Sequence, residues 1–192
     1  WSHFGAANVW GTISADPELG YAYLPVSSVS HDRYGGERPG ENLFSDCLVA
    51  VDARTGEYIW HYQLIHHTLW NYDPPAAPIL LDVTIDGELR KIVVQVTKQS
   101  YAYVFDRITG EPIWPIEERP APASDVEGEV TSPTQPHPTR PAPYDRQGFT
   151  VDDLIDFTPE LREQALQELG DRRMGPLYTP PSLGGSVQMP GE

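Results

Sequence analysis

The first 117 residues are divided into short runs rich in β-branched and aromatic side chains, with turn-forming residues between the runs. Such runs are typical of β-strands, because branched and aromatic side chains pack well on a pleated surface. The pattern predicts two groups of four strands, separated by a polar loop over residues 28–43. The strands are expected at residues 9–14, 21–26, 47–52 and 57–64, and then at 78–85, 89–97, 101–106 and 111–116.

Two of the predicted turns are copies of one another. In each copy an Asp enters the turn, where its carboxylate can accept hydrogen bonds from backbone N–H groups, and a Gly supplies a positive φ. A Trp follows four residues into the return strand, where it can pack between neighbouring sheets. The 54-residue spacing between the copies is close to that of four-stranded propeller blades, whereas the alternative is two unrelated hairpins with buried tryptophans. The copies read Ala50-x-Asp52-x-x-Thr55-Gly56-x-x-x-Trp60 and Val104-x-Asp106-x-x-Thr109-Gly110-x-x-x-Trp114.

The last third of the chain has a different pattern. Residues 118–150 are rich in proline and are expected to run extended over a surface, without a core of their own. A helix is predicted at about 158–169, because Thr158 can cap its N-terminus and Gly170 can end it. We therefore expect an all-β fold, with two propeller blades over residues 1–117. Residues 118–192 would form a Pro-rich connection with this short helix, leading to the next blade.

Composition restricts the partners. The chain has 13 Lys and Arg against 28 Asp and Glu, a formal charge of −15, so no nucleic acid is expected as a partner. The hydrophobic fraction of 39% is enough for a folded core, and no apolar run reaches the roughly 18 residues of a membrane-spanning helix. A single cysteine, Cys47, excludes a disulfide within the chain.

Further motifs accompany the repeated turn. They are Ala7-Asn8-Val9-Trp10, Tyr23-Leu24-Pro25, His66-His67-x-Leu69-Trp70-Asn71-Tyr72-Asp73-x-Pro75-Ala76, Thr97-Lys98, Trp114-Pro115-Ile116-Glu117-Glu118, Thr131-Ser132-Pro133-Thr134-Gln135-Pro136 and Leu177-Tyr178-Thr179-Pro180-Pro181-Ser182. Together they resemble the quinoprotein dehydrogenases, eight-bladed propellers with tryptophan-docking motifs that carry pyrroloquinoline quinone (PQQ). The resemblance is to the membrane-bound glucose dehydrogenase branch and runs over nearly the whole chain.

The resemblance implies a part of a PQQ-dependent dehydrogenase that oxidises a sugar or alcohol hydroxyl and passes electrons to a quinone or cytochrome. It implies PQQ and Ca²⁺ or Mg²⁺ as cofactors, the remaining blades as partners, and a periplasmic location with an inner-membrane anchor outside this chain as one option. Two alternatives stay open: a non-catalytic propeller that serves as a binding scaffold, and a carbohydrate-binding module that uses Tyr21, Tyr23 and Trp70. Taken alone, two blades expose edge strands and are expected to aggregate or oligomerise.

A PQQ site needs a surface for stacking, a positive charge near the carboxylates and a base for the substrate hydroxyl. By the resemblance, Trp10 aligns with the tryptophan near the quinone ring, and Lys98 can hydrogen-bond to the quinone oxygens. Asn71 could bind the cation through its carbonyl oxygen, while Ser28 stands near the position of a family ligand but is a weak ligand itself.

The position of the base departs from the family pattern. Relatives carry Leu-Trp-Asp-x-Asp with the first Asp as general base, whereas this chain has Leu69-Trp70-Asn71-Tyr72-Asp73. An amide such as that of Asn71 does not accept a proton at neutral pH. Three outcomes stay open: Asp73 takes over the role of base, His66 or His67 does, or dehydrogenase activity is lost. The candidate catalytic residues are Asp73, Asn71 and Lys98.

Overall fold

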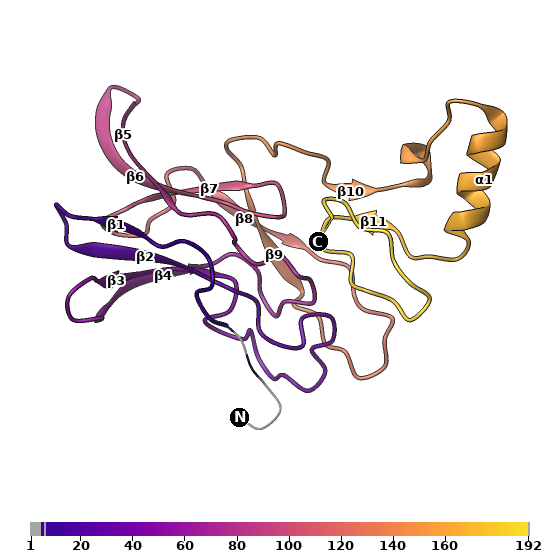
Figure 1. Cartoon of the computed structure of the whole chain (residues 1–192), viewed down its shortest axis with the longest axis horizontal. Helices are drawn as coiled ribbons and strands as arrows, with labels where there is room; N and C mark the ends of the chain where they lie inside the picture. Colours follow the sequence, from indigo (N-terminus) through magenta and orange to yellow (C-terminus); the bar gives the residue numbers. More distant parts are fainter. Residues whose placement is uncertain (1–4, 6, 192) are drawn as a thin grey trace.

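Two antiparallel sheets that follow one another in sequence make up the first half of the computed structural model, which describes residue 5 and residues 7–191 (Figure 1). The all-β propeller-type arrangement predicted from the sequence is confirmed. The first sheet contains β1 (Ser14–Asp16), β2 (Tyr21–Val26), β3 (Cys47–Asp52) and β4 (Tyr58–Gln63), in that order. The second contains β5 (Ile79–Ile85), β6 (Glu88–Val96) and β7 (Ala102–Asp106).

The second sheet lacks the fourth strand that was predicted at residues 111–116. After β7 a single antiparallel bridge joins Phe105 to Pro112, and the chain then leaves the sheet. Two hydrogen bonds flank this bridge, from the Asp106 N–H to the Glu111 carbonyl and from the Ile113 N–H to the Val104 carbonyl, and the pairing ends there, before Pro115, which has no backbone N–H. The chain instead forms β8 (Ile116–Pro120), which pairs with β9 (Thr134–Pro138).

The first predicted strand is also shorter than expected, since pairing with β2 begins only at Ser14. Residues before it follow a different path: the Ala7 N–H donates to the Ser28 carbonyl, and the Asn8 carbonyl accepts from Ser27. Gly11 lies close to the next loop, where a Cβ would come within 3.0 Å of the Pro75 carbonyl oxygen. The segment therefore packs on loops and does not extend the sheet.

Trp60 joins the two sheets, as the repeated turn predicts. Its side chain is buried, its ring lies near Tyr23 of the first sheet and Phe105 of the second, and its Nε1–H donates to the carbonyl of Arg107 at 3.3 Å. Trp114 is only half-buried, in a segment that forms no strand. The docking role of this second tryptophan stays a prediction.

The repeated turn has the same geometry in both copies and occurs a third time. In each, the Oδ1 atom of the Asp accepts hydrogen bonds from the N–H groups two and three residues later, at 2.8–3.1 Å. The glycine four residues after the Asp has a φ of 71–77°. The third copy lacks the Thr and Trp, so the sequence pattern did not reveal it. The three turns are Asp16–Gly20, Asp52–Gly56 and Asp106–Gly110.

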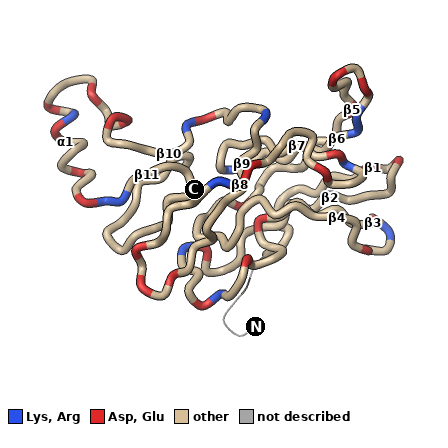
Figure 2. The backbone as a smooth tube through the Cα atoms, turned by 180° about the vertical axis from the view of Figure 1, so that it is seen from behind, with Lys and Arg blue, Asp and Glu red and all other residues tan. Residues whose placement is uncertain are grey.

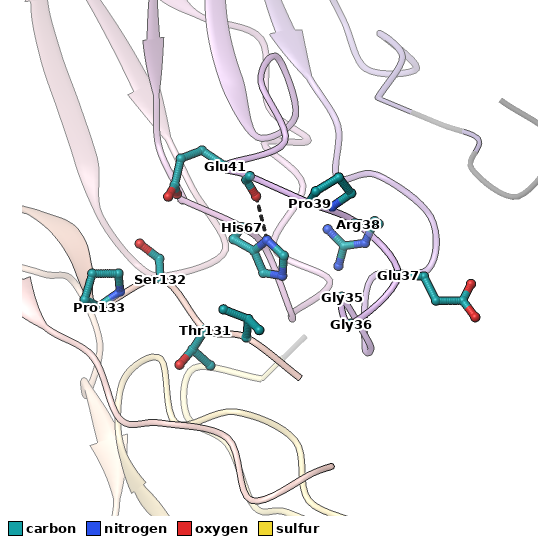
Figure 3. Close-up of a pocket in the computed structure, with 12 residues that line it drawn as sticks. Gly35, Gly36, Glu37, Arg38, Pro39, Glu41, His67, Thr131, Ser132 and Pro133 are labelled. Atoms are coloured by element: carbon teal, nitrogen blue, oxygen red, sulfur yellow. Dashed lines mark hydrogen bonds between the residues drawn. The ribbon is translucent and has the colours of Figure 1, made fainter. Parts of the chain in front are cut away.

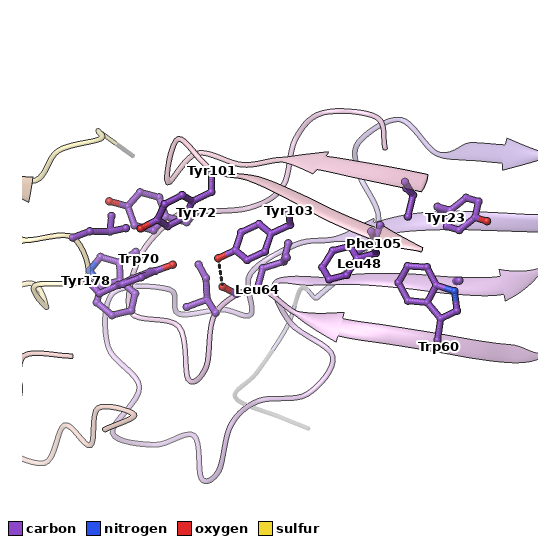
Figure 4. Close-up of a cluster of buried hydrophobic side chains, with 14 of the residues drawn as sticks. Tyr23, Leu48, Trp60, Leu64, Trp70, Tyr72, Tyr101, Tyr103, Phe105 and Tyr178 are labelled. Carbon is purple, nitrogen blue, oxygen red and sulfur yellow. Dashed lines mark hydrogen bonds between the residues drawn. The ribbon is translucent and has the colours of Figure 1, made fainter. Parts of the chain in front are cut away.

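An aromatic core extends from the sheets to the loop that follows β4 (Figure 4). In that loop Trp70 donates from Nε1 to the carbonyl of Thr179 at 3.0 Å, and the Tyr72 hydroxyl donates to the carbonyl of Pro190 at 2.9 Å. The C-terminal loop therefore holds the segment that carries the predicted base.

The Pro-rich segment contributes to this core, which was not expected. Gln135 and Pro136 of β9 are buried, and the Tyr103 hydroxyl donates to the Pro136 carbonyl at 2.9 Å. A strand can contain these prolines because β9 pairs only with β8. The division of the chain at residue 117 stays a prediction, and residues 1–4, 6 and 192 of the proposed units lie outside the described residues.

The predicted helix is present as α1 (Pro159–Leu169), at the end of the molecule away from the two sheets (Figure 1). Thr158 caps it by accepting from the Leu161 N–H, and Gly170 follows its last residue. Short elements flank it: η1 (Val151–Asp153), β10 (Gly148–Phe149) and β11 (Gly175–Pro176), of which β10 and β11 pair.

Charged positions are spread over the whole fold. Figure 2 shows acidic and basic residues interspersed on α1 and at the tip of the β5–β6 hairpin. Within the described residues, no helix is long and apolar enough to cross a bilayer.

Candidate functional site

Three of the predicted site residues, Trp10, Asn71 and Asp73, line one pocket of about 310 Å³. It lies where the loop after β2 meets the loop after β4. We call it the Trp10–Asp73 pocket. Its lining residues are Asn8, Trp10, Ser27, Ser28, Ser30, Asp32, Asn71 and Asp73.

Trp10 offers an open aromatic surface in this pocket, because 57% of the side chain is exposed. The backbone before it is held to the loop after β2 by hydrogen bonds at Ala7 and Asn8. An exposed indole on a fixed backbone is suited to stacking against a flat ring.

Lys98 lies in the turn that follows β6 and contacts both candidate residues of the neighbouring loop. Its Nζ donates to the carbonyl oxygen of Asn71 at 2.9 Å, contacts Asn71 Oδ1, and lies 3.4 Å from Asp73 Oδ2. The Lys98 side chain is 25% exposed and that of Asp73 is 14% exposed. The structure therefore brings the three candidate catalytic residues Lys98, Asn71 and Asp73 together and leaves the ammonium group partly accessible.

Asp73 is the one carboxylate among the predicted catalytic residues. Its Oδ1 accepts the backbone N–H of Ser28 at 2.7 Å, and its Oδ2 faces Lys98. The charge-assisted hydrogen bond and the ion pair fix the orientation of the carboxylate. Asn71, by contrast, uses both ends of its amide: Lys98 contacts Oδ1, and Nδ2 donates to Asp32 Oδ2 at 2.9 Å.

Two acidic residues of the site were missed from the sequence. Asp32 lines the pocket beside Asn71, and Asp46 lies beneath it, fully buried. Burial raises the pKa of Asp46 to about 7, although hydrogen bonds from Ser28 and Ser45 partly oppose this. Nothing in the sequence distinguishes these two residues from the other acidic residues, because only the fold brings them under the pocket.

The two histidines lie elsewhere. His66 Nε2 is 3.0 Å from Glu118 Oε1, and its backbone N–H donates to Gln135. His67 Nδ1 is 2.7 Å from the Gly40 carbonyl oxygen, and its Nε2 is 3.5 Å from Glu129 Oε1. Neither lines the Trp10–Asp73 pocket, so their placement does not support a role as its base.

His67 instead lines a second cavity of about 410 Å³ (Figure 3). The glycine-rich loop over residues 35–41 and residues 130–133 form its other walls. There the His67 ring touches the loop so closely that a Cβ on Gly35 would come within 2.4 Å of Nε2. In this position His67 fixes the loop and has no access to the first pocket.

All 192 residues match the family described as "PQQ: Glucose/ethanol/alcohol dehydrogenase, beta-propeller domain". The chain belongs to this family of PQQ β-propellers. Its curated relatives include quinoprotein glucose dehydrogenases.

The curated relatives are much longer than this chain. The quinate/shikimate dehydrogenase (quinone) of Acinetobacter baylyi is 33% identical over 188 residues, which are 97% of this chain and 23% of that protein. The quinoprotein glucose dehydrogenase of Gluconobacter oxydans is 36% identical over 199 residues, 99% of this chain and 24% of that protein. The chain thus spans about a quarter of their length.

Solved structures show the same architecture. The quinohemoprotein alcohol dehydrogenase of Comamonas testosteroni superimposes with a TM-score of 0.55 at 27% identity, over 71% of this chain and 20% of that chain. The quinohemoprotein alcohol dehydrogenase ADH-IIG of Pseudomonas putida gives a TM-score of 0.54 at 33% identity, and the match covers 70% of this chain and 20% of that chain. These similarities confirm the fold and the family, whereas the roles of single residues stay predictions.

Proposed function

We propose that the protein containing this chain is a PQQ-dependent dehydrogenase that oxidises the hydroxyl of a sugar or alcohol and passes the electrons to a quinone or cytochrome. The observation that carries the proposal is that Trp10, Asn71 and Asp73 line one pocket and that Lys98 contacts both Asn71 and Asp73 beside it. These residues come from segments far apart in the sequence, so their proximity is a property of the fold.

The residues present fit one edge of a PQQ site. The exposed indole of Trp10 provides a stacking surface, and the accessible ammonium of Lys98 provides a positive charge for an anionic ligand. When bound, PQQ supplies the group that accepts the hydride. The other walls would come from blades outside this chain.

A Ca²⁺ or Mg²⁺ ion is part of the proposal. The carboxylate of Asp32 and the amide oxygen of Asn71, once released from Lys98, are oxygen ligands of the kind these ions prefer. Within the described part of the chain, no group of three or more His, Cys, Asp or Glu side chains is arranged to hold a metal ion. Further ligands would therefore have to come from the rest of the protein.

Asp73 is the proposed base. Ser28 holds Oδ1, which leaves Oδ2 to take the proton of the substrate hydroxyl. The ammonium of Lys98, 3.4 Å from Oδ2, orients this atom and balances the negative charge of the pocket. Asn71 hydrogen-bonds to Asp32 and Lys98 and fixes the position of both.

The test uses the full-length protein, titrated with PQQ in the presence of Ca²⁺ or Mg²⁺ and followed by the absorption spectrum of PQQ. Dye reduction is then measured with a panel of sugars and alcohols. Lys98→Met should weaken PQQ binding. Lys91→Met is the control: Lys91 lies in β6, shortly before Lys98 in the chain, and its ammonium pairs with the exposed Glu18 and Asp82, so its loss should not weaken PQQ binding. A protein that neither binds PQQ nor reduces dye would overturn the proposal.

The second candidate is a non-catalytic propeller that binds a partner. Asn71 favours it, because an amide stands where relatives are expected to carry the base. PQQ binding without turnover of any sugar or alcohol would support loss of activity, and absence of PQQ binding would support the scaffold.

A periplasmic location is also proposed, and fractionation of cells that express the full-length protein tests it.

A further inference from the structure

A buried carboxylate lies directly beneath the Trp10–Asp73 pocket. Asp46 has no exposed surface, and its Oδ1 accepts the hydroxyl of Ser28 at 2.7 Å while its Oδ2 accepts the hydroxyl of Ser45 at 3.1 Å. In the described part of the chain its side chain makes no ion pair. Burying a carboxylate costs several kcal/mol unless hydrogen bonds compensate, so its retention needs a reason.

The backbone at Asp46 is also unusual. Its φ of 49° lies in the left-handed region, which is uncommon for residues other than glycine. Its N–H donates to the Ser27 carbonyl at 3.2 Å, and its carbonyl accepts from Leu64 at 2.7 Å. The surrounding loops therefore hold this residue in a strained conformation that points its carboxylate at Ser28.

Ser28 links Asp46 to the proposed base. Its hydroxyl donates to Asp46, while its backbone N–H donates to Asp73 Oδ1 at 2.7 Å. Its carbonyl accepts the N–H of Ala7, and only 5% of the residue is exposed. Both ends of Ser28 are thus fixed, and Ser28 orients the Asp73 carboxylate together with Lys98.

We infer that Asp46 is a positioning residue for Asp73, acting through Ser28. This inference rests on the proposed function, because it assigns a role to a residue that supports the proposed base. By holding the Ser28 hydroxyl, Asp46 keeps the Ser28 N–H directed at Oδ1, so that Oδ2, which faces the Lys98 ammonium, is the oxygen that takes the proton. Misplacement of a reacting group by about 1 Å costs roughly a hundredfold in rate, so a weaker hold of this kind should lower kcat by about tenfold.

The test compares five variants of the full-length protein. Asp46→Ala and Ser28→Ala each break the link and should each lower kcat about tenfold, with KM changed less than about twofold. The double variant should be no slower than either single variant, because both changes remove the same link. Asp46→Asn keeps an oxygen that can accept from Ser28 and should restore at least about a third of kcat. Ser45→Ala is the matched control, since it removes the other hydroxyl on Asp46 and leaves the link to Asp73 intact.

A second measurement does not depend on activity. Hydrogen exchange of the peptide that contains Ser28 should be about tenfold faster in Asp46→Ala than in Ser45→Ala, because the Ser28 N–H is released from Asp73. If Asp46→Ala does not fold, Ser28→Ala decides by itself. The inference would be overturned if Ser28→Ala left both kcat and the hydrogen-exchange rate of this peptide unchanged. It would also be overturned if the fold-loss of kcat in the double variant equalled the product of the fold-losses in the two single variants. A wild-type protein without turnover contradicts the proposed function, and the exchange rates then decide the link between Asp46 and Asp73.

Discussion

The indole ring of Trp60 lies directly on the Cα of Gly110. A Cβ added at Gly110 would come within 2.5 Å of ring atom Cδ2. Trp60 belongs to the last strand of the first sheet and Gly110 to the turn after the second, so this contact joins the two blades. Gly110 therefore meets two needs, a positive φ of 77° and the close approach of the ring. Gly56, at the same place in the other copy of the turn, has a φ of 75° but nothing within 4 Å of a Cβ.

Substitution of the two glycines by alanine separates these needs. Gly56→Ala should cost only the strain of a positive φ, about 1 kcal/mol. Gly110→Ala should cost that amount and about 1–3 kcal/mol more, because the ring of Trp60 must move. Thermal unfolding of the full-length protein measures the difference. Equal losses for the two variants would show that the ring does not rest on Gly110.

Arg107 is expected to stabilise the contact between the two sheets through its ion pairs. Its guanidinium lies 2.8 Å from Asp16 Oδ2 and 2.9 Å from Asp82 Oδ1, and its side chain is 8% exposed. Arg107→Leu leaves the buried Asp16 without its partner and should destabilise the protein by about 3–5 kcal/mol. Asp82→Asn, on the half-exposed side, should cost about 1 kcal/mol or less. Urea unfolding measures the loss of stability in each variant. A larger loss in Asp82→Asn than in Arg107→Leu would contradict the prediction.

Exchange of the two residues at the proposed base gives a direct kinetic prediction. Asp73→Asn should lower kcat by about 10²–10⁴-fold, since general-base catalysis contributes that much, and should leave PQQ binding in place. Asn71→Asp restores a carboxylate at the position where the family carries its base. In the Asp73→Asn background it should recover part of the lost rate. No loss of rate in Asp73→Asn would exclude Asp73 as the base, and steady-state dye reduction is the measurement.

His137 should make stability depend on pH. Burial, assisted by the charge of Arg119, lowers its pKa to about 4, so the folded protein keeps the ring neutral, with Nδ1 2.7 Å from the Tyr101 hydroxyl. The unfolded chain binds a proton at about pH 6.5, so this contribution is present above pH 6.5 and is lost as the pH falls toward 4. Because the ring is partly exposed, we expect on the order of 1 kcal/mol between pH 7 and 5. Urea midpoints should fall more steeply in the wild type than in His137→Asn, and parallel curves would contradict the assignment.

Much of the fold could be predicted because it depends on local signals. The turns at Asp52 and Asp106 have the hydrogen bonds that their side chains can make, and Thr158 caps α1 as its position predicts. The family motifs also led to Trp10 and Lys98. In the structure Trp10 lines the Trp10–Asp73 pocket, and Lys98 contacts Asn71 beside it. These features need only a short stretch of sequence, or a pattern shared with relatives.

What could not be predicted depends on long-range contacts. The segment expected as a strand at 111–116 pairs with β7 only around Pro112, and β8 instead pairs with β9 in the Pro-rich segment. Asp32 and Asp46 reach the pocket from the loop between β2 and β3, where no periodic pattern sets their position. Asp46 is buried because of how the loops pack on one another, so its burial could not be predicted from the neighbouring residues in the sequence.

The hydrogen bonds from Trp70 and Tyr72 to the carbonyls of Thr179 and Pro190 connect positions 109 and 118 residues apart. For protein engineering this means that a tag, a linker or a circular-permutation break placed between residues 179 and 190 would disturb a loop far upstream. The tip of the β5–β6 hairpin, at Asp86 and Gly87, is open to solvent and is a better place for such an insertion.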